Sequence, residues 1–222
     1  PLVAVVGNPN CGKSAIFNAL TGLRQKVANY PGATVERRIG NIDHADLTLI
    51  DLPGSDSLTP RSADEEVTCQ VVTGKHAIER KPDVILSVVD ATNLAQHLRF
   101  SLELRALGIP IVIALNMTDL AAREKIAIDA DALSKKLGVP VVETVAVRKK
   151  GLGDLVSALE KAVRAPAPNE LDFGSDIRQR QKAARKIASD VTISEGVGHK
   201  ATRNNDRVLL NPAVGPLILF AL

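Results

Sequence analysis

Residues 2–20 read LVAVVGNPNCGKSAIFNAL and join an apolar run to a helix-forming run through a glycine-containing loop. Within them, Gly7 to Ser14 has the pattern G-x-x-x-x-G-K-S of a phosphate-binding loop. A strand before this motif and a helix after it form the context that the motif requires. Backbone N–H groups of the loop and the positive end of the helix dipole then hold a polyphosphate. The stretch predicts a nucleoside triphosphate site; the alternative is a plain glycine turn between strand and helix.

The whole loop and the residue after it are expected to contact the nucleotide. Lys13 is expected to reach the β and γ phosphates, and the hydroxyl of Ser14 to bind Mg²⁺. The predicted contacts in this stretch are Gly7, Asn8, Pro9, Asn10, Cys11, Gly12, Lys13, Ser14 and Ala15.

The composition restricts the class of protein. Of the 222 residues 45% are hydrophobic but only 2% are aromatic, so we expect an aliphatic core of the kind found in parallel sheets. The net charge is +3, the basic residues are dispersed and stacking side chains are scarce, so no nucleic-acid partner is expected. Two cysteines, one of them in the loop, fit a reducing compartment. The four histidines have no metal-ligand spacing, so no transition-metal site is expected.

Apolar runs alternate with helical stretches along the first 164 residues. Strands are predicted at 2–7, 34–42, 47–51, 83–89, 110–116 and 140–145, and helices at 13–21, 62–79, 94–107, 129–137 and 151–164. This order is typical of a doubly wound, mostly parallel α/β sheet with helices on both faces. Binding loops of such a sheet lie at the carboxyl ends of its strands.

The composition changes after residue 164, which gives the predicted domain organisation. Residues 1–164 form a nucleotide-binding domain, 165–170 a linker containing APAPN, and 171–212 a small helical domain. Residues 213–222 are almost wholly apolar, yet a membrane span needs about 20 residues. This last segment is either a packed C-terminal helix or the beginning of a membrane span.

A second nucleotide motif, Asp51-Leu52-Pro53-Gly54, ends the strand predicted at 47–51 and has the form D-x-x-G. Asp51 is expected to hold a water molecule on Mg²⁺, and the N–H group of Gly54 to sense the γ-phosphate. Ser55 follows at a position where some GTPases carry a glutamine that orients water. Slow intrinsic hydrolysis is therefore predicted.

A third motif, Asn116-Met117-Thr118-Asp119, closes the strand predicted at 110–116 and reads N-x-x-D. The Asp119 carboxylate can accept hydrogen bonds from N1–H and the 2-amino group of guanine, whereas adenine opposes it with an acceptor at N1. Met117 stands where lysine is more usual and is expected to lie over the base. Residues Ala146, Val147 and Arg148 are expected, from position alone, to back guanine O6 through backbone N–H groups. The motif therefore predicts guanine as the base.

Two further residues are predicted to act in catalysis beside Lys13 and Gly54. Thr34 lies in the loop 22–36, and its hydroxyl is expected to join Mg²⁺ when the γ-phosphate is present, which makes the loop a switch. The side-chain oxygen of Asn10 is expected to hold a monovalent cation where other enzymes use an arginine. The alternatives are a threonine that opens a strand and an asparagine that stabilises a turn.

Four segments together resemble the cytosolic amino-terminal part of the ferrous iron transport protein B family. They are GNPNCGKS at 7–14, NYPGATVE at 29–36, DLPGSDSL at 51–58 and NMTD at 116–119. The resemblance implies slow, Mg²⁺-dependent hydrolysis of GTP to GDP that is accelerated by K⁺ on Asn10. Asp56, in place of an aromatic residue, and Ala146, in place of serine, depart from the family pattern.

The resemblance also implies a setting for the segment. The helical domain would stabilise bound GDP, and a membrane permease would follow in the same polypeptide, with 213–222 as the cut-off start of its first span. The segment would then lie on the cytoplasmic face of a bacterial inner membrane, where oligomers are possible. Iron is expected to be handled elsewhere in the polypeptide.

Three hypotheses about function follow. The leading one is a GTPase module that regulates Fe²⁺ import. The alternative is a soluble translation- or ribosome-associated GTPase that binds RNA. The third is a module that binds nucleotide without turnover, which the serine at position 55 makes conceivable.

Overall fold

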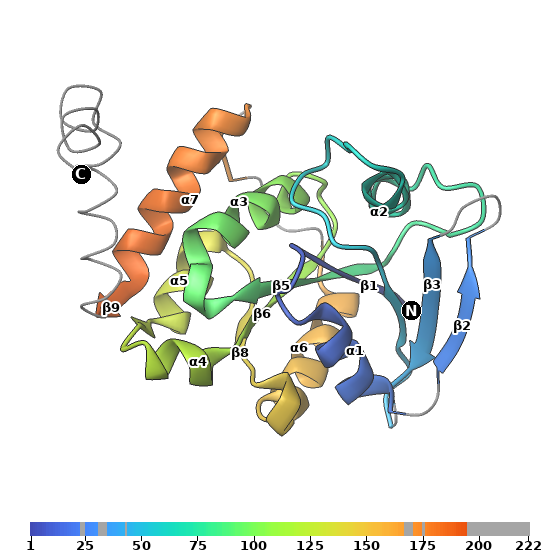
Figure 1. The fold of residues 1–222 in the computed structure, drawn as a ribbon, viewed down its shortest axis with the longest axis horizontal. Helices are drawn as coiled ribbons and strands as arrows, with labels where there is room; N and C mark the ends of the chain where they lie inside the picture. The colour runs from blue at the N-terminus through green and yellow to red at the C-terminus, as the bar shows by residue number, and fades with distance from the viewer. Residues whose placement is uncertain (23–24, 31–34, 43, 167–170, 175, 195–222) are drawn as a thin grey trace, which may run out of the picture.

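A seven-stranded sheet forms the centre of the molecule (Figure 1). The structure is a computed structural model that describes residues 1–22, 25–30, 35–42, 44–166, 171–174 and 176–194. The strand order is β2-β3-β4-β1-β5-β6-β8. Strands β4, β1, β5, β6 and β8 run parallel, while β2 and β3 add an antiparallel edge. The bounds are β1 Leu2–Gly7, β2 Gln25–Asn29, β3 Glu36–Asn41, β4 Thr48–Asp51, β5 Val84–Asp90, β6 Ile111–Asn116 and β8 Val141–Glu143. The predicted mostly parallel sheet is confirmed.

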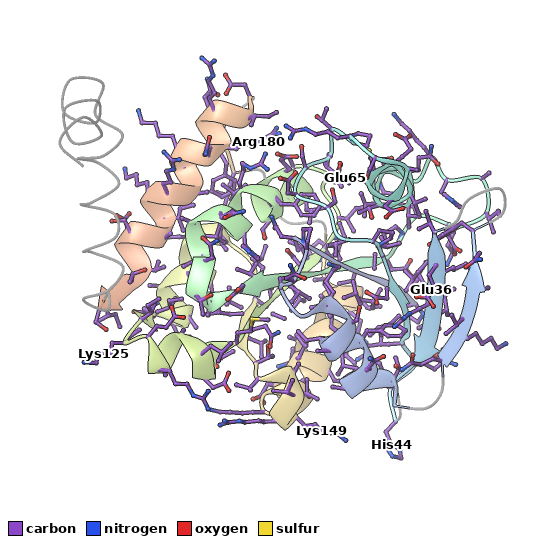
Figure 2. All side chains as sticks on the ribbon, viewed as in Figure 1. Glu36, His44, Glu65, Lys125, Lys149 and Arg180 are labelled. Atoms are coloured by element: carbon purple, nitrogen blue, oxygen red, sulfur yellow. The ribbon has the colours of Figure 1, made fainter. Side chains whose placement is uncertain are left out.

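Helices cover both faces of the sheet because the strand side chains alternate between two aliphatic cores. In β1, Ala4 and Val6 join the core beneath α2, α3, α5 and α7, whereas Val3 and Val5 join the core beneath α1 and α6. The helices are α1 Lys13–Thr21, α2 Ala63–Thr73, α3 Leu94–Arg105, α4 Thr118–Arg123, α5 Ala130–Leu137, α6 Leu152–Arg164 and α7 Ile177–Val191, with short 3₁₀ turns η1 Ala91–Asn93 and η2 Ala146–Arg148. Polar side chains such as those of Lys125, Lys149 and His44 project from the periphery (Figure 2).

The structure corrects the predicted helix at 62–79. Helix α2 begins after Ser62, whose hydroxyl accepts a hydrogen bond from the N–H of Glu65, and it ends at Thr73. Gly74 adopts a left-handed conformation with φ of 72° and donates its N–H to carbonyls of the last turn. The residues after it therefore form a loop, in which Glu79 is buried against Arg37 of β3.

Several elements were not predicted, among them β2, α4 and the short strands β7 (Ala127–Ile128) and β9 (Thr192–Ser194). The strand β2, of sequence QKVAN, lacks an apolar run and is defined only by its pairing with β3. The short helix α4 follows directly on the N-x-x-D loop. The predicted strand at 34–42 is found as β3, although Thr34 lies outside the described residues.

The helical stretch predicted after the linker is present as α7, and it packs on α3 and α5 (Figure 1). Strand β9, Thr192–Ser194, then pairs antiparallel with β7, Ala127–Ile128, and the ammonium of Lys136 lies 2.8 Å from the carboxylate of Asp190. Residues 167–170 of the predicted linker and the apolar segment 213–222 lie outside the described residues. None of the helices described is both long and apolar enough to cross a membrane. The domain boundaries stay a prediction.

Leu98 on α3 tests the importance of the core between the sheet and α7. Its side chain is fully buried, so Leu98→Ala is expected to lower the free energy of unfolding by about 2–5 kcal/mol through lost burial and a residual cavity. Denaturant unfolding followed by circular dichroism measures this change. The matched variant Leu171→Ala, at a site 43% exposed, is expected to change it by less than about 1 kcal/mol. Equal effects would contradict the assigned core.

Candidate nucleotide-binding site

Two glycines allow the loop between β1 and α1 to pack closely against its neighbours. A Cβ atom at Gly7 would lie 2.5 Å from the carbonyl oxygen of Val88 on β5. At Gly12, φ is +91° and a Cβ atom would lie 2.3 Å from Nδ2 of Asn116. Helix α1 begins at the next residue, so its unpaired N–H groups and positive dipole end face the loop. Both glycines of the motif are thus required by packing, and the loop is suited to an anion.

Lys13 lies beneath this loop and brings the second motif to it. Its side chain is buried, and Nζ donates a hydrogen bond of 3.1 Å to the carbonyl oxygen of Asn8. A Cβ atom at Gly54 would lie 3.2 Å from the same Nζ atom, which places the D-x-x-G segment against the phosphate loop. The Lys13 ammonium, the backbone at Gly54 and the N-terminus of α1 therefore lie close together, an arrangement suited to a polyphosphate.

Ser14 and Asp51 form the part of the site that fits a divalent cation. The Ser14 hydroxyl donates a hydrogen bond of 2.9 Å to Oδ2 of Asp51, whereas Oδ1 is buried and has no partner among the described residues. Burial raises the pKa of the Asp51 carboxyl, against the opposing effects of the Ser14 hydrogen bond and the nearby Lys13 charge. A carboxylate oxygen and a hydroxyl are ligands that Mg²⁺ accepts, together with waters and phosphate oxygens. In the described part of the chain no group of three or more His, Cys, Asp or Glu side chains could hold a metal.

The side chain of Asn116 joins three loops. Its Nδ2 atom donates to the carbonyl oxygen of Cys11 at 3.1 Å. Its Oδ1 atom accepts from the N–H of Ala146 at 3.2 Å and from the Thr144 hydroxyl at 3.3 Å. The residue is only 2% exposed, so these bonds replace its contacts with water. Asn116 therefore holds the phosphate loop and the 144–148 loop in one arrangement.

The neighbouring positions form the rim of the predicted guanine site. Met117 has a left-handed φ of 62° and turns the chain so that Asp119 lies in the first turn of α4. Oδ2 of Asp119 lies 3.6 Å from Nε of Arg148, so the N-x-x-D loop and the 146–148 turn meet. Val147 is 82% exposed on that turn. The N–H groups of Ala146 and Arg148 are engaged with Asn116 and with the Val145 carbonyl, which leaves the N–H of Val147 as the predicted donor to guanine O6.

The remaining predicted residues lie at the phosphate end or outside the described part. Asn10 is exposed and left-handed, with φ of 63°, at the tip of the phosphate loop. Cys11 is fully buried, and this burial raises the pKa of its thiol to about 11. Thr34 is not described, but the N–H of Tyr30 donates to the carbonyl oxygen of Val35 at 2.9 Å, and both flanking side chains are buried. The loop that carries Thr34 is therefore anchored at both ends.

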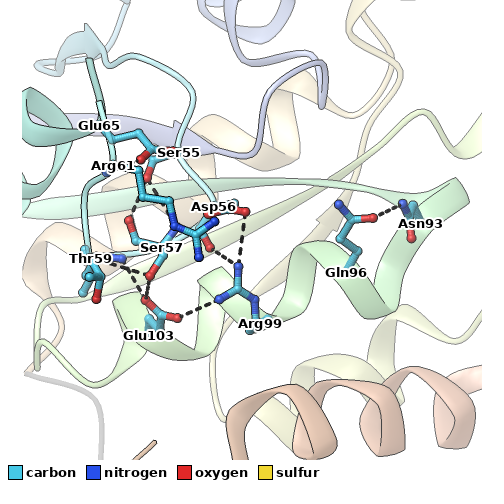
Figure 3. A network of polar contacts seen from close by, with 11 residues as sticks. Ser55, Asp56, Ser57, Thr59, Arg61, Glu65, Asn93, Gln96, Arg99 and Glu103 are labelled. Atoms are coloured by element: carbon cyan, nitrogen blue, oxygen red, sulfur yellow. Dashed lines mark hydrogen bonds and ion pairs between the residues drawn. The ribbon is translucent and has the colours of Figure 1, made fainter. Parts of the chain in front are cut away.

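A polar network beyond Gly54 was missed by sequence reasoning (Figure 3). The buried carboxylate of Glu103 on α3 accepts hydrogen bonds from the Ser57 hydroxyl at 3.1 Å and the Leu58 N–H at 2.8 Å. Arg99 donates to the carbonyl oxygen of Asp56 at 2.8 Å and lies 3.4 Å from its carboxylate. Asp56, which departs from the family pattern, thus has a cationic partner, Arg99, on helix α3. The sequence feature that could have indicated this network is Glu103, a charged residue between Leu102 and Leu104 of α3.

The fold and these loops define the G-domain class of phosphate-loop proteins. A family model described as "Ferrous iron transport protein B" matches residues 2–159. The chain belongs to this family.

Comparisons with individual proteins agree with this assignment. The Fe(2+) transporter FeoB of Salmonella typhimurium is 44% identical over 230 residues, which cover 93% of this chain and 29% of the transporter. The cytosolic domain of FeoB from L. pneumophila superimposes with a TM-score of 0.77 at 28% identity, covering 87% of this chain and all of that domain. A GDP-bound point mutant of NFeoB from S. thermophilus gives a TM-score of 0.68 at 40% identity, covering 78% of this chain and 64% of that one. The chain thus spans less than a third of the curated transporter that it matches.

Replacing Asn116 tests whether its amide holds the site together. Asn116→Ala leaves buried groups of Cys11 and Ala146 without their partner, so the free energy of unfolding without nucleotide is expected to fall by about 1–3 kcal/mol. Denaturant unfolding provides the measurement. The control Asn93→Ala removes an exposed amide bonded to Gln96 and is expected to cost less than about 0.5 kcal/mol. An Asn116 variant as stable as this control would contradict the bridging role.

Proposed function

We propose that this chain is the GTP-binding, slowly hydrolysing module of a bacterial ferrous iron transporter. The observation that carries the proposal is the Asn116 amide, which joins the phosphate loop to the loops that would enclose guanine. A polyphosphate site and a base site are thereby held at a fixed separation. The family assignment and the GDP bound to the S. thermophilus protein support guanine nucleotide as the ligand.

The Asp119 carboxylate carries the proposed choice of base. It would accept from guanine N1–H and from the 2-amino group at once, and the N–H of Val147 would donate to O6. Adenine lacks the 2-amino group and places an acceptor opposite the carboxylate, so it would leave polar groups unpaired.

The proposed hydrolysis uses residues at the other end of the site. Lys13 and the N–H of Gly54 would hold the γ-phosphate, while Ser14, Asp51 and Thr34 would hold Mg²⁺ directly or through water. The ion would neutralise charge that develops on the phosphate oxygens. Ser55 is fully buried and donates its hydroxyl to the carbonyl of Ser57, so it would not orient the attacking water. Slow turnover is the expected result.

Potassium is the proposed source of additional positive charge. The exposed carboxamide of Asn10 lies on the phosphate loop, where its oxygen would hold K⁺ beside the phosphates. A fixed cation there would stabilise the transition state as an arginine does elsewhere.

The wider role follows from the family rather than from this segment. The matched relatives are much longer, and we propose that a membrane permease domain of the same polypeptide follows, with this segment on the cytoplasmic face of the inner membrane. Nucleotide state would then regulate Fe²⁺ passage. The alternative, a translation- or ribosome-associated GTPase, is disfavoured by the family assignment.

Calorimetric titration with GTP and ATP in Mg²⁺ tests the nucleotide assignment. GTP is expected to bind at least about 100-fold more tightly than ATP, because the base site pairs with guanine only. Lys13→Ala is expected to abolish binding, while the exposed control Lys26→Ala leaves the affinity unchanged. Equal affinity for ATP, or micromolar GTP binding by the Lys13 variant, would overturn the assignment.

Phosphate release in K⁺ and in Na⁺ tests the role of Asn10. The wild-type rate is expected to be several-fold higher in K⁺, and Asn10→Ala is expected to lose this stimulation while keeping GTP affinity within about threefold, because the side chain would act on the cation. Asn93→Ala serves as the control and should keep the stimulation. Stimulation that survives in the Asn10 variant would place the cation elsewhere.

A further inference from the structure

Helix α7 carries an unusual share of the positive charge. Five of its residues are basic, namely Arg178, Arg180, Lys182, Arg185 and Lys186, and one, Asp190, is acidic, which gives five minus one, or +4. The whole chain has a net charge of +3, so the other residues together sum to −1. The positive character of the protein is therefore concentrated in one helix of 15 residues.

Four of these residues form one face, here named the basic face: Arg178, Lys182, Arg185 and Lys186. All four are exposed. At the helical rotation of about 100° per residue they fall within about 100° of the circumference. The buried Ala184, Ile187 and Val191 lie on the opposite side. Among the described residues helix α7 lies at one side of the molecule and packs on α3 and α5 (Figure 1). Because the four basic residues are exposed and lie opposite the buried ones, the basic face is directed away from α3 and α5.

The basic face is little neutralised by the described part of the chain, where the charge of Asp190 acts on Lys186 as well as on Lys136. None of its four residues forms an ion pair with another described residue, and Asp190, the acidic residue of the helix, is paired with Lys136 of α5. Arg180 is turned inward and donates to the carbonyl oxygen of Gly174, so it is not counted in the face. The four charges are thus available to an external partner.

The arrangement opposes the stability of the helix itself. Lys182 lies four residues from both Arg178 and Lys186, and like charges at this spacing repel. Arg178 stands in the first turn, which is unfavourable at the positive end of the helix dipole, and the carboxylate of the N-cap residue Asp176 offsets only part of this cost. Local stability therefore does not account for the basic face, whereas an anionic partner would.

We propose that the basic face of α7 docks on the anionic lipid headgroups of a bilayer. The inference rests on the proposed function, in which this segment is the cytosolic part of a membrane transporter. A row of charges along about 12 Å of one helix suits a planar array of phosphates. Single-stranded RNA is less well matched, since only 2% of residues are aromatic and bases would lack stacking partners.

Vesicle co-sedimentation of the 222-residue chain tests the proposal. Binding to vesicles of phosphatidylglycerol and phosphatidylcholine is expected, with little binding to phosphatidylcholine alone and weaker binding at high salt. Each charge near an anionic surface contributes about a fivefold gain in partition. The variant Arg178→Gln, Lys182→Gln, Arg185→Gln, Lys186→Gln is therefore expected to lose at least about 50-fold.

The matched control changes the same amount of charge elsewhere. It is Lys26→Gln, Lys75→Gln, Lys150→Gln, Lys161→Gln, with all four residues exposed and outside α7. This control is expected to keep partition within about fivefold of wild type. Both variants are expected to bind GTP as wild type does, and their circular dichroism spectra should be unchanged.

The outcomes separate the docking proposal from its alternatives. Equal losses in the two variants would mean attraction by net charge alone and would overturn the proposal. Equal binding to neutral vesicles would indicate apolar insertion, and binding of an RNA oligonucleotide without vesicle binding would indicate a nucleic-acid face; either result overturns it. Failure to dock with intact GTP binding rejects the membrane face only, whereas absence of GTP binding by the wild type rejects the proposed function.

Discussion

The buried carboxamide of Asn116 connects the parts of the site that the chain supplies from distant positions. One atom bonds the phosphate loop that follows β1, and the other bonds the loop that follows β8. A primary amide has both donors and an acceptor, so one side chain can satisfy backbone groups of two loops at once. Because these groups are withdrawn from water, an alternative placement of either loop would leave them unpaired. This residue therefore helps to fix the separation of the proposed phosphate and base subsites.

A second polar connection runs from the phosphate end towards the flank of the molecule. Gly54 touches the phosphate loop, and the segment after it is bonded to Glu103 and Arg99 on α3. The same helix packs against α7, which carries the basic face. The proposed nucleotide site and the proposed membrane-docking surface are therefore joined through one helix.

Much of the fold was predictable because its signals are local. The runs that became β1, β5 and β6 are almost wholly apolar, as is typical of strands buried on both faces. The errors occurred where local preference was weak. The polar strand β2 exists only through pairing with β3, and α2 stopped early because Gly74 offered a left-handed cap. The contact of Ala146 with guanine stays a prediction, and in the structure its N–H is bonded to Oδ1 of Asn116.

The sequence by itself determined the phosphate loop, the alternation of strands and helices, and the motifs at the strand ends. These depend on the backbone freedom of Gly7 and Gly12 and on residue type over short spans. Only the tertiary structure decided which groups meet across the sheet. The Asn116 amide bonds a carbonyl 105 residues away, and the Ser57 hydroxyl bonds Glu103 at a distance of 46 residues. Such pairings depend on the order of strands and the packing of helices, so they cannot be inferred from residues that are neighbours in the chain.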